Sequence, residues 1–202
     1  MDWQFEKLAG PFGGVTEGPV WTGDALLFTH IQASRILRFD PKKGEVTEYI
    51  TGTDRTNGLC FDAQGRLYGC SGGGRCIVRF EAGGRMTRLP DRLDGKRHNN
   101  PNDLAIDRQG RIWFTDPWGN ANDKTGMELD HESVLRLDPQ PGGGWALRRM
   151  TFDTTHPNGI LISPDNGTLY VAESDYGVDR KRELRAYPIR DDGTLGPYIT
   201  LH

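Results

Sequence analysis

A pattern that recurs four times along the chain constrains its fold more than any other feature. In each repeat, a small polar motif opens an apolar stretch, which leads through a turn into a second apolar stretch. The equivalent polar positions are Glu17, Asn57, Asn102 and Asn158, with spacings of 40, 45 and 56 residues. Self-similarity at such a period indicates an array of repeated structural units rather than a single layered domain.

Each repeat contains four short stretches with the pattern of β-strands. Apolar and polar residues alternate in them, as expected of antiparallel strands with one buried face. Turns of the Asp-x-x-Gly type follow the first strand at Asp62–Gly65 and Asp107–Gly110. No window of about 11 residues has a convincing helical period. Four antiparallel strands in a repeat of this length are typical of a β-propeller blade.

We therefore predict an all-β chain forming a single propeller domain over residues 1–202. The four blades are expected at about 15–50, 56–89, 102–152 and 158–202. Residues 3–8 are predicted to form a separate strand ahead of the first blade. Such a strand completes the last blade of a closed propeller and removes an open sheet edge.

Composition excludes several classes of protein. With 25 basic and 28 acidic residues, the chain has no basic surplus for binding nucleic acid. No apolar run approaches the roughly 18 residues of a transmembrane helix, so we expect no membrane partner. The N-terminal residues lack the basic and apolar regions of a signal peptide.

The three cysteines, Cys60, Cys70 and Cys76, indicate the compartment. An odd number without metal-binding spacing argues against a disulfide framework or a zinc site. We predict free thiols and a cytoplasmic protein, with a Cys70–Cys76 bridge across a hairpin as the alternative.

The repeated polar positions are candidate metal ligands. First strands of propeller blades line the central axis, so equivalent positions converge at one of its ends. The carboxylate of Glu17 and the carboxamides of Asn102 and Asn158 are hard oxygen ligands, which suit calcium or magnesium. Alternatively, an Asn supports only a turn, because it tolerates left-handed backbone. We favour that alternative for Asn57 and the metal site for the other three residues.

Several strings of residues resemble the family of gluconolactonases, senescence marker protein and luciferin-regenerating enzyme. The likeness runs from about residue 15 to the end of the chain, and its motifs occur in the expected order. The stretch from Asp94 to Asn102 looks most like bacterial gluconolactonases. The matching strings are Glu17-Gly18-Pro19-Val20-Trp21, Asn100-Pro101-Asn102-Asp103-Leu104, Trp113-Phe114-Thr115-Asp116-Pro117, His156-Pro157-Asn158-Gly159 and Tyr170-Val171-Ala172-Glu173-Ser174.

The resemblance implies a six-bladed propeller that hydrolyses a sugar lactone such as gluconolactone. It implies one divalent metal ion, calcium first, with magnesium, zinc or manganese as alternatives. The metal ligands fall on Glu17 and Asn158, with Asn102 as a ligand or a substrate contact. Asn100 stands where some animal members have Arg, and it is a second expected substrate contact. Independently of the resemblance, the loop Trp118–Glu132 is the longest insertion, and we expect it to cover the metal end with Trp118 as a third substrate contact; the alternative is a solvated loop.

The catalytic residue is not identified within the chain. The resemblance assigns the general base to an Asp in the blade after the one bearing Asn158, about 40–55 residues further on. Residues 198–202 contain no Asp, so this residue is expected beyond residue 202. Six blades of about 45 residues need about 270, so the chain corresponds to about two-thirds of a propeller. We expect the chain alone to expose open edges and to be weak or inactive.

Two other functions remain open at this stage. The chain could be a non-catalytic propeller used as a binding scaffold, or an inactive fragment of a lactonase, because fold does not fix function. A paraoxonase-like hydrolase would need an axial pair of histidines. His98 and His156 lie near Asn102 and Asn158 and are the histidines of interest. The Gly69–Gly73 segment matches a nucleophile elbow, but we predict a hairpin there.

Overall fold

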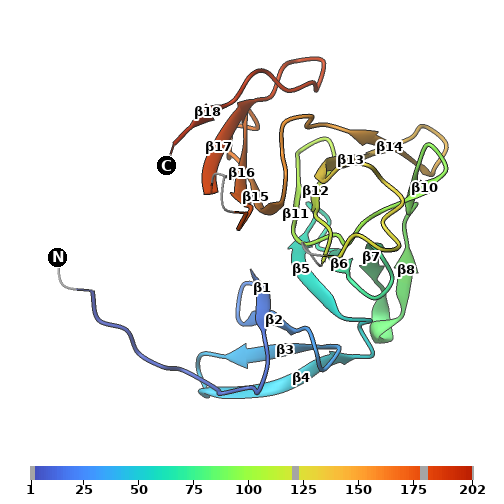
Figure 1. Cartoon of the computed structure of the whole chain (residues 1–202). Helices are drawn as coiled ribbons and strands as arrows, with labels where there is room; N and C mark the ends of the chain where they lie inside the picture. Colours follow the sequence, from blue (N-terminus) through green and yellow to red (C-terminus); the bar gives the residue numbers. More distant parts are fainter. Residues whose placement is uncertain (1–2, 120–122, 178–181, 202) are drawn as a thin grey trace.

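The computed structural model describes residues 3–119, 123–177 and 182–201 and confirms an all-β, four-bladed arrangement. Four four-stranded antiparallel sheets stand around a common centre like propeller blades (Figure 1). In every sheet the strands follow chain order, so each blade is a meander with its first strand innermost. Within these residues, no helix has the length and apolar character required to cross a membrane.

The strands have the following bounds. The first blade contains β1 (Thr16–Trp21), β2 (Leu26–His30), β3 (Arg35–Asp40) and β4 (Glu45–Thr51). The second contains β5 (Thr56–Phe61), β6 (Leu67–Ser71), β7 (Cys76–Phe80), the 3₁₀ turn η1 (Ala82–Gly84) and β8 (Met86–Arg88). The third contains β11 (Leu104–Ile106), β12 (Ile112–Asp116), β13 (Ser133–Pro139) and β14 (Trp145–Arg149). The fourth contains β15 (Pro157–Ile162), β16 (Thr168–Ser174), β17 (Arg182–Pro188) and β18 (Ile199–Thr200).

The turns between first and second strands are closed by their own aspartates. Asp62 Oδ1 accepts hydrogen bonds from the backbone N–H groups of Gln64 and Arg66 at 3.0 and 2.9 Å. Asp107 makes the equivalent bonds, and its Oδ2 also accepts from the indole N–H of buried Trp113 at 2.9 Å. The glycines that end these turns have φ of 75° and 76°, in the left-handed region that favours Gly.

The hydrophobic core lies between successive blades rather than inside any one of them. Because a strand exposes two faces, each sheet can bury apolar side chains against both neighbours. The three interfaces are centred on Leu27, Ile36, Leu59 and Val78 between blades one and two, on Tyr68, Ile77, Phe114 and Leu135 between blades two and three, and on Trp113, Val134, Leu169 and Val171 between blades three and four.

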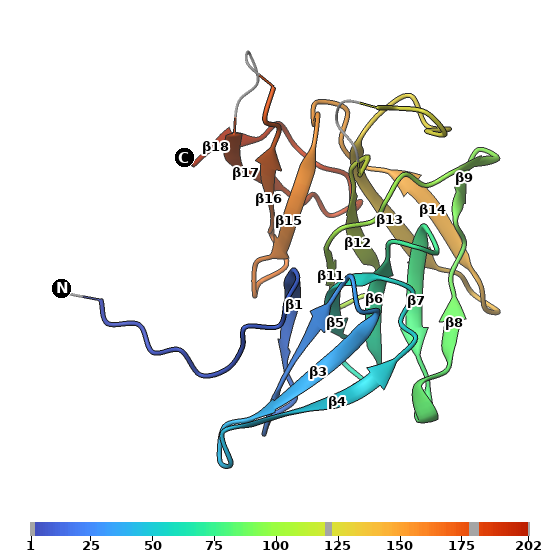
Figure 2. The same cartoon turned by 60° about the horizontal axis from the view of Figure 1, so that its bottom comes forward.

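Several local predictions can be compared directly with the structure. Residues 3–8 form no strand in the structure. The blade that they are expected to complete is not among the described sheets, so their closing role stays a prediction. They run away from the blades (Figure 2), with the side chains of Trp3 and Phe5 78% and 94% exposed. An alternating pattern forms a strand only where a sheet edge accepts it, and no described sheet pairs with this segment.

The second blade shows two further outcomes. The Gly69–Gly73 segment lies in the hairpin between β6 and β7, as predicted, and not in a nucleophile elbow. Cys60, Cys70 and Cys76 are free thiols. A two-stranded hairpin of β9 (Arg92–Leu93) and β10 (Lys96–Arg97) precedes the third blade and was not predicted.

Candidate functional site

The four repeated polar positions meet at one cavity. Glu17 lies on β1, Asn57 on β5 and Asn158 on β15, and Asn102 lies just before β11. All four line an axial cavity of about 510 Å³ between the innermost strands of the blades. Residues that are up to 141 positions apart in the sequence thus share one space, because each occupies the same place in its own blade.

A β-bulge accompanies three of these positions, Glu17, Asn57 and Asn158. The pairing register of the first and second strands shifts between Glu17 and Val20, between Thr56 and Leu59, and between Pro157 and Ile160. Bulges redirect side chains and are common beside functional sites. None of the three asparagines has the positive φ that a left-handed turn would require, so the turn explanation favoured for Asn57 is not supported.

The side chains at the four positions are uncommitted, whereas the backbone around them is fixed. Within the described parts of the chain, no hydrogen bond or ion pair engages the side chain of Glu17 or of the three asparagines. By contrast, Gly58 N donates to Asn102 O at 2.9 Å, and Thr115 Oγ1 donates to Asn158 O at 2.5 Å. A rigid frame therefore presents one carboxylate and three carboxamides to a common cavity.

This donor set fits a hard divalent cation. Calcium takes carboxylate and carboxamide oxygens, whereas zinc sites are built from Cys, His and carboxylate ligands. The described residues contain no group of three or more His, Cys, Asp or Glu side chains able to hold a metal. Oxygen ligands supplied mostly by asparagines therefore favour calcium or magnesium over zinc.

Asp103, which the sequence did not single out, is a second carboxylate lining the axial cavity. Its Oδ1 accepts from Leu104 N at 2.9 Å and its Oδ2 from Ile160 N at 3.3 Å. Burial, reinforced by the nearby charge of Glu17, raises the pKa of Asp103 to about 6. Because both oxygens are engaged by backbone N–H groups, Asp103 links the third blade to the fourth.

Gly58 allows the first strands of the second and third blades to approach closely. A Cβ at Gly58 would lie 2.4 Å from Asp103 Oδ1 and 2.7 Å from Asp103 Cα. We expect Gly58→Ala to lower the free energy of unfolding by about 1–3 kcal/mol, because overpacking must shift the backbone. Gly159, the equivalent glycine beside Asn158, is the control, since its Cβ would meet only Ala172 Cβ at 3.6 Å. Urea unfolding of both variants measures the difference, and equal losses would contradict this explanation.

A second cavity of about 400 Å³, called here the upper cavity, adjoins the axial cavity, and Asn57 lines both. Two of the predicted substrate contacts, Asn100 and Trp118, line the upper cavity, whereas Asn102 lines the axial one. The long loop contributes Trp118, Gly119, Asp123 and Thr125. The remaining lining residues are Ile31, Arg55, Gly72, Arg75, Asn99 and Pro101.

Two glycines leave room for the side chain of Asn100. A Cβ at Gly72 would lie 3.1 Å from Asn100 Oδ1, and one at Gly119 would lie 2.9 Å from Asn100 Nδ2. The backbone of Asn100 is also fixed, because its N–H donates to Pro117 O at 3.0 Å. The carboxamide of Asn100 therefore extends from a fixed backbone at the wall of the upper cavity.

Arg55 and Arg75 are the lining residues that the motif analysis missed. Both have left-handed backbone, with φ of 56° and 52°. Residues other than glycine rarely adopt a left-handed backbone, and those that do frequently lie at functional sites. The repeats did contain a signal for one of them: Arg55 precedes Asn57 by two residues, as Asn100 precedes Asn102 and His156 precedes Asn158.

A buried polar layer lies behind the upper cavity. Asn99 N donates to Asp116 Oδ2 at 2.8 Å, and Asn99 Nδ2 donates to Asp116 O at 3.0 Å. Burial raises the pKa of Asp116 to about 8, so its carboxyl group is protonated at neutral pH. Burial also lowers the pKa of His98 to about 4, and His98 packs against Phe114 with ring centroids 5.2 Å apart. His98 is therefore a neutral core residue and not an exposed ligand.

His156 is held by a carboxylate of the long loop. Its Nδ1 lies 2.6 Å from Glu132 Oε2, which also accepts from Trp118 N at 2.9 Å. Lys124 forms an ion pair with the other oxygen of Glu132. Although burial alone would raise it, these partners hold the pKa of Glu132 below its ordinary value. Glu132 thus ties the loop to the start of β15, near Asn158.

Comparison with known proteins gives a consistent result. The family model described as the SMP-30/Gluconolactonase/LRE-like region matches residues 15–198. A gluconolactonase of Zymomonas mobilis is 30% identical over 178 residues, covering 79% of this chain and 49% of that protein. A 6-deoxy-6-sulfogluconolactonase of Pseudomonas putida is 29% identical over 186 residues, which cover 89% of this chain and 57% of that protein.

Structural comparison agrees with the sequence matches. The solved structure of a gluconolactonase from Xanthomonas campestris superposes with a TM-score of 0.81 at 38% identity, covering 92% of this chain and 61% of that one. The chain spans about half the length of the curated relatives it matches.

Proposed function

Because this chain belongs to the SMP-30/gluconolactonase/LRE-like family, we propose that the protein hydrolyses a sugar lactone such as gluconolactone. The observation that carries the proposal is the convergence of four uncommitted oxygen-bearing side chains on the axial cavity, next to a second, open cavity. Two relatives are named for lactones of this class, gluconolactone and 6-deoxy-6-sulfogluconolactone. The activity is a proposal for the whole protein, because this chain spans about half the length of the relatives that it matches.

In this proposal Glu17, Asn102 and Asn158 hold one divalent cation, with calcium as the first candidate. Asn57 lines the same cavity and adds a fourth oxygen donor. When bound, such a cation supplies a Lewis acid that polarises a carbonyl and stabilises negative charge on its oxygen. Asn100 and Trp118 bind the sugar: the carboxamide exchanges hydrogen bonds with hydroxyl groups, and the indole covers the apolar face of the ring. The general base is assigned by family resemblance to an Asp beyond residue 202.

Hydrolysis of glucono-1,5-lactone by the full-length protein tests the proposal. Each turnover releases an acid, so a pH-stat follows the rate, and spontaneous hydrolysis is subtracted. We expect a calcium-dependent rate that is lost with a chelator and restored by calcium. Calcium binding without any lactone hydrolysis would instead support the propeller as a binding scaffold, and the absence of both would overturn the proposal.

We also propose a cytoplasmic location. The three cysteines are free thiols, and burial raises the pKa of Cys60 and of Cys76 to about 11. Free thiols are typical of proteins kept in a reducing compartment. Fractionation of the native host cells tests this location.

A further inference from the structure

We propose that the upper cavity selects lactones that carry an anionic group, which Arg55 and Arg75 bind. This inference rests on the proposed lactonase function and names the substrate class of that site. Arg55 and Arg75 both line the upper cavity, which also contains the two predicted sugar contacts, Asn100 and Trp118. An anionic substituent distant from the ester, such as a phosphate, carboxylate or sulfonate, would reach these arginines while the ester faces the axial end.

Arg75 is an anchored cation. Its Nε donates to the carbonyl oxygens of His98 and Asn99, both at 2.8 Å, and its Nη2 also donates to His98 O. Its Nη1 donates to Gly126 O at 3.4 Å, and its guanidinium lies over the Trp118 ring, 5.2 Å from the centroid. These partners are neutral, so they fix the side chain without neutralising its charge. Each terminal nitrogen retains a second N–H for a ligand.

Arg55 is a second cation with a fixed backbone and an uncommitted side chain. Its N–H donates to Ser34 Oγ at 3.1 Å, and its carbonyl accepts from Gly72 N at 3.3 Å. Within the described residues, its exposed guanidinium has no hydrogen-bond or ion-pair partner. The backbone of Arg55 is left-handed, with φ of 56°, which is unfavourable for a residue other than glycine. This strained residue lies at the wall of the upper cavity.

The carboxylates around the upper cavity offset these two charges only in part. Asp123 is the one acidic residue among those that line it, so two positive charges against one negative leave a single net positive charge in the lining. Asp54 accepts from Ser71 Oγ, and Glu132 is engaged by Lys124 and His156.

The acidic groups that face Arg75 from further away have other partners. Asp91 lies 3.5 Å from Arg97 Nε, and Glu128 accepts from Arg97 N at 2.9 Å. Asp116 is protonated at neutral pH, because burial raises its pKa to about 8. The cavity therefore keeps a positive surplus.

The surrounding groups suit a polyhydroxylated ligand with an anionic end. Guanidinium groups bind phosphate and carboxylate through paired, parallel hydrogen bonds, which makes them selective for planar or tetrahedral oxyanions. Asn100 lines the same cavity, and its carboxamide can exchange hydrogen bonds with sugar hydroxyl groups.

The test compares neutral and anionic lactones with the full-length, calcium-loaded protein. Substrates are glucono-1,5-lactone, its 6-phosphate and glucaro-1,4-lactone, which carries a carboxylate. We expect kcat/KM to be at least about 10-fold higher for one or both anionic lactones. Arg55→Gln should lower kcat/KM for the preferred anionic lactone at least about 10-fold more than for the neutral one. Added salt should weaken the preference, because it screens exposed charges.

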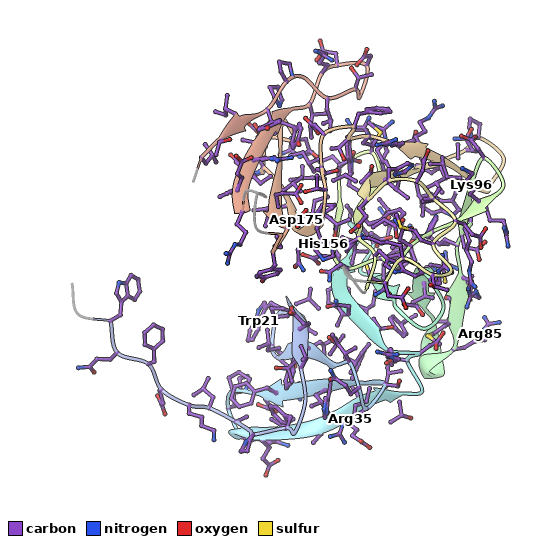
Figure 3. All side chains as sticks on the ribbon, in the orientation of Figure 1. Trp21, Arg35, Arg85, Lys96, His156 and Asp175 are labelled. Carbon is purple, nitrogen blue, oxygen red and sulfur yellow. The ribbon has the colours of Figure 1, made fainter. Side chains whose placement is uncertain are left out.

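Arg85→Gln is the matched control, since Arg85 is exposed on the outer side of the second blade (Figure 3). Arg85→Gln should leave kcat/KM unchanged for both the anionic and the neutral lactone. An equal loss for both classes in Arg55→Gln, or no preference in the unmodified protein, would overturn the inference while leaving the lactonase proposal intact. If no lactone is hydrolysed, the lactonase proposal fails, and calorimetry with 6-phosphogluconate and gluconate still tests the anion site. Equal affinity for these two compounds would overturn it.

Discussion

Replacing Glu17 by Gln is expected to abolish calcium binding and to slow lactone hydrolysis by more than about 100-fold. Mutating a residue that only hydrogen-bonds to a metal ligand typically costs about 10–100-fold in affinity or activity, so a direct ligand should cost more. Among the four side chains that converge on the axial cavity, Glu17 alone is a carboxylate, whereas the other three are neutral carboxamides. Gln preserves the size of the side chain and one oxygen but removes the charge that attracts a divalent cation. Calorimetric titration with calcium and a hydrolysis assay measure the two effects.

Glu45→Gln, on the outer strand β4 of the same blade, is the control for a general loss of charge. Thermal unfolding adds a readout that does not depend on catalysis. A bound ion stabilises the folded state, so a chelator should lower the Tm of the unmodified protein and of Glu45→Gln, but not that of Glu17→Gln. Undiminished calcium binding in Glu17→Gln would remove this residue from the metal site.

Replacing Asp116 by Asn is expected to flatten the dependence of stability on pH. Burial raises the folded-state pKa of Asp116 to about 8, from an ordinary value of 3.8. The folded protein thus holds a proton that the unfolded chain releases above about pH 4. Stabilisation by the neutral carboxyl group is complete below pH 4 and is lost as the pH rises through about 8. The loss is at most roughly 6 kcal/mol, from about 1.4 kcal/mol for each pKa unit.

The measurement is urea unfolding of the unmodified protein and of Asp116→Asn at intervals from pH 5 to pH 9. Subtracting the two curves isolates Asp116 from groups such as His98, whose lowered pKa acts at acid pH. Asp130→Asn, at an exposed position of the long loop, is the control and should leave the curve unchanged in shape. Parallel curves for the unmodified protein and Asp116→Asn would show that this carboxyl group is ionised in the folded state.

The repeated part of the fold could be read from the sequence because a blade is a local structure. Strands β3 and β16 lie within the first and fourth predicted blades, and the turns at Asp62 and Asp107 close through bonds that span at most four residues. Convergence on the axis follows from the repeat itself, since equivalent positions in successive blades face one centre. This reasoning placed Glu17, Asn102 and Asn158 together without any coordinates.

The remaining features depend on partners that the sequence pattern does not identify. The segment 3–8 alternates like a strand, but a strand exists only where another backbone edge pairs with it. The contact between Glu132 and His156 joins residues 24 positions apart through a long loop, and no periodicity encodes it. Arg55 and Arg75 were missed because a left-handed backbone places them at the wall of the upper cavity. A single Arg in a loop gives no sequence signal of that conformation. His98 was of interest only because it lies near Asn102 in the sequence, and burial makes it part of the core.

The Asp-x-x-Gly turns and the convergent asparagines occupy opposite ends of the same inner strands. One end is closed within each blade by its own side chains, and the other is open to whatever enters the axis. Folding stability and ligand specificity can therefore change independently of each other in proteins with this architecture. Randomising Arg55, Asn100 and Trp118 together should yield variants that still fold yet differ in the molecules they accept, whereas randomising Asp62 and Asp107 should alter the yield of folded protein and leave ligand preference alone.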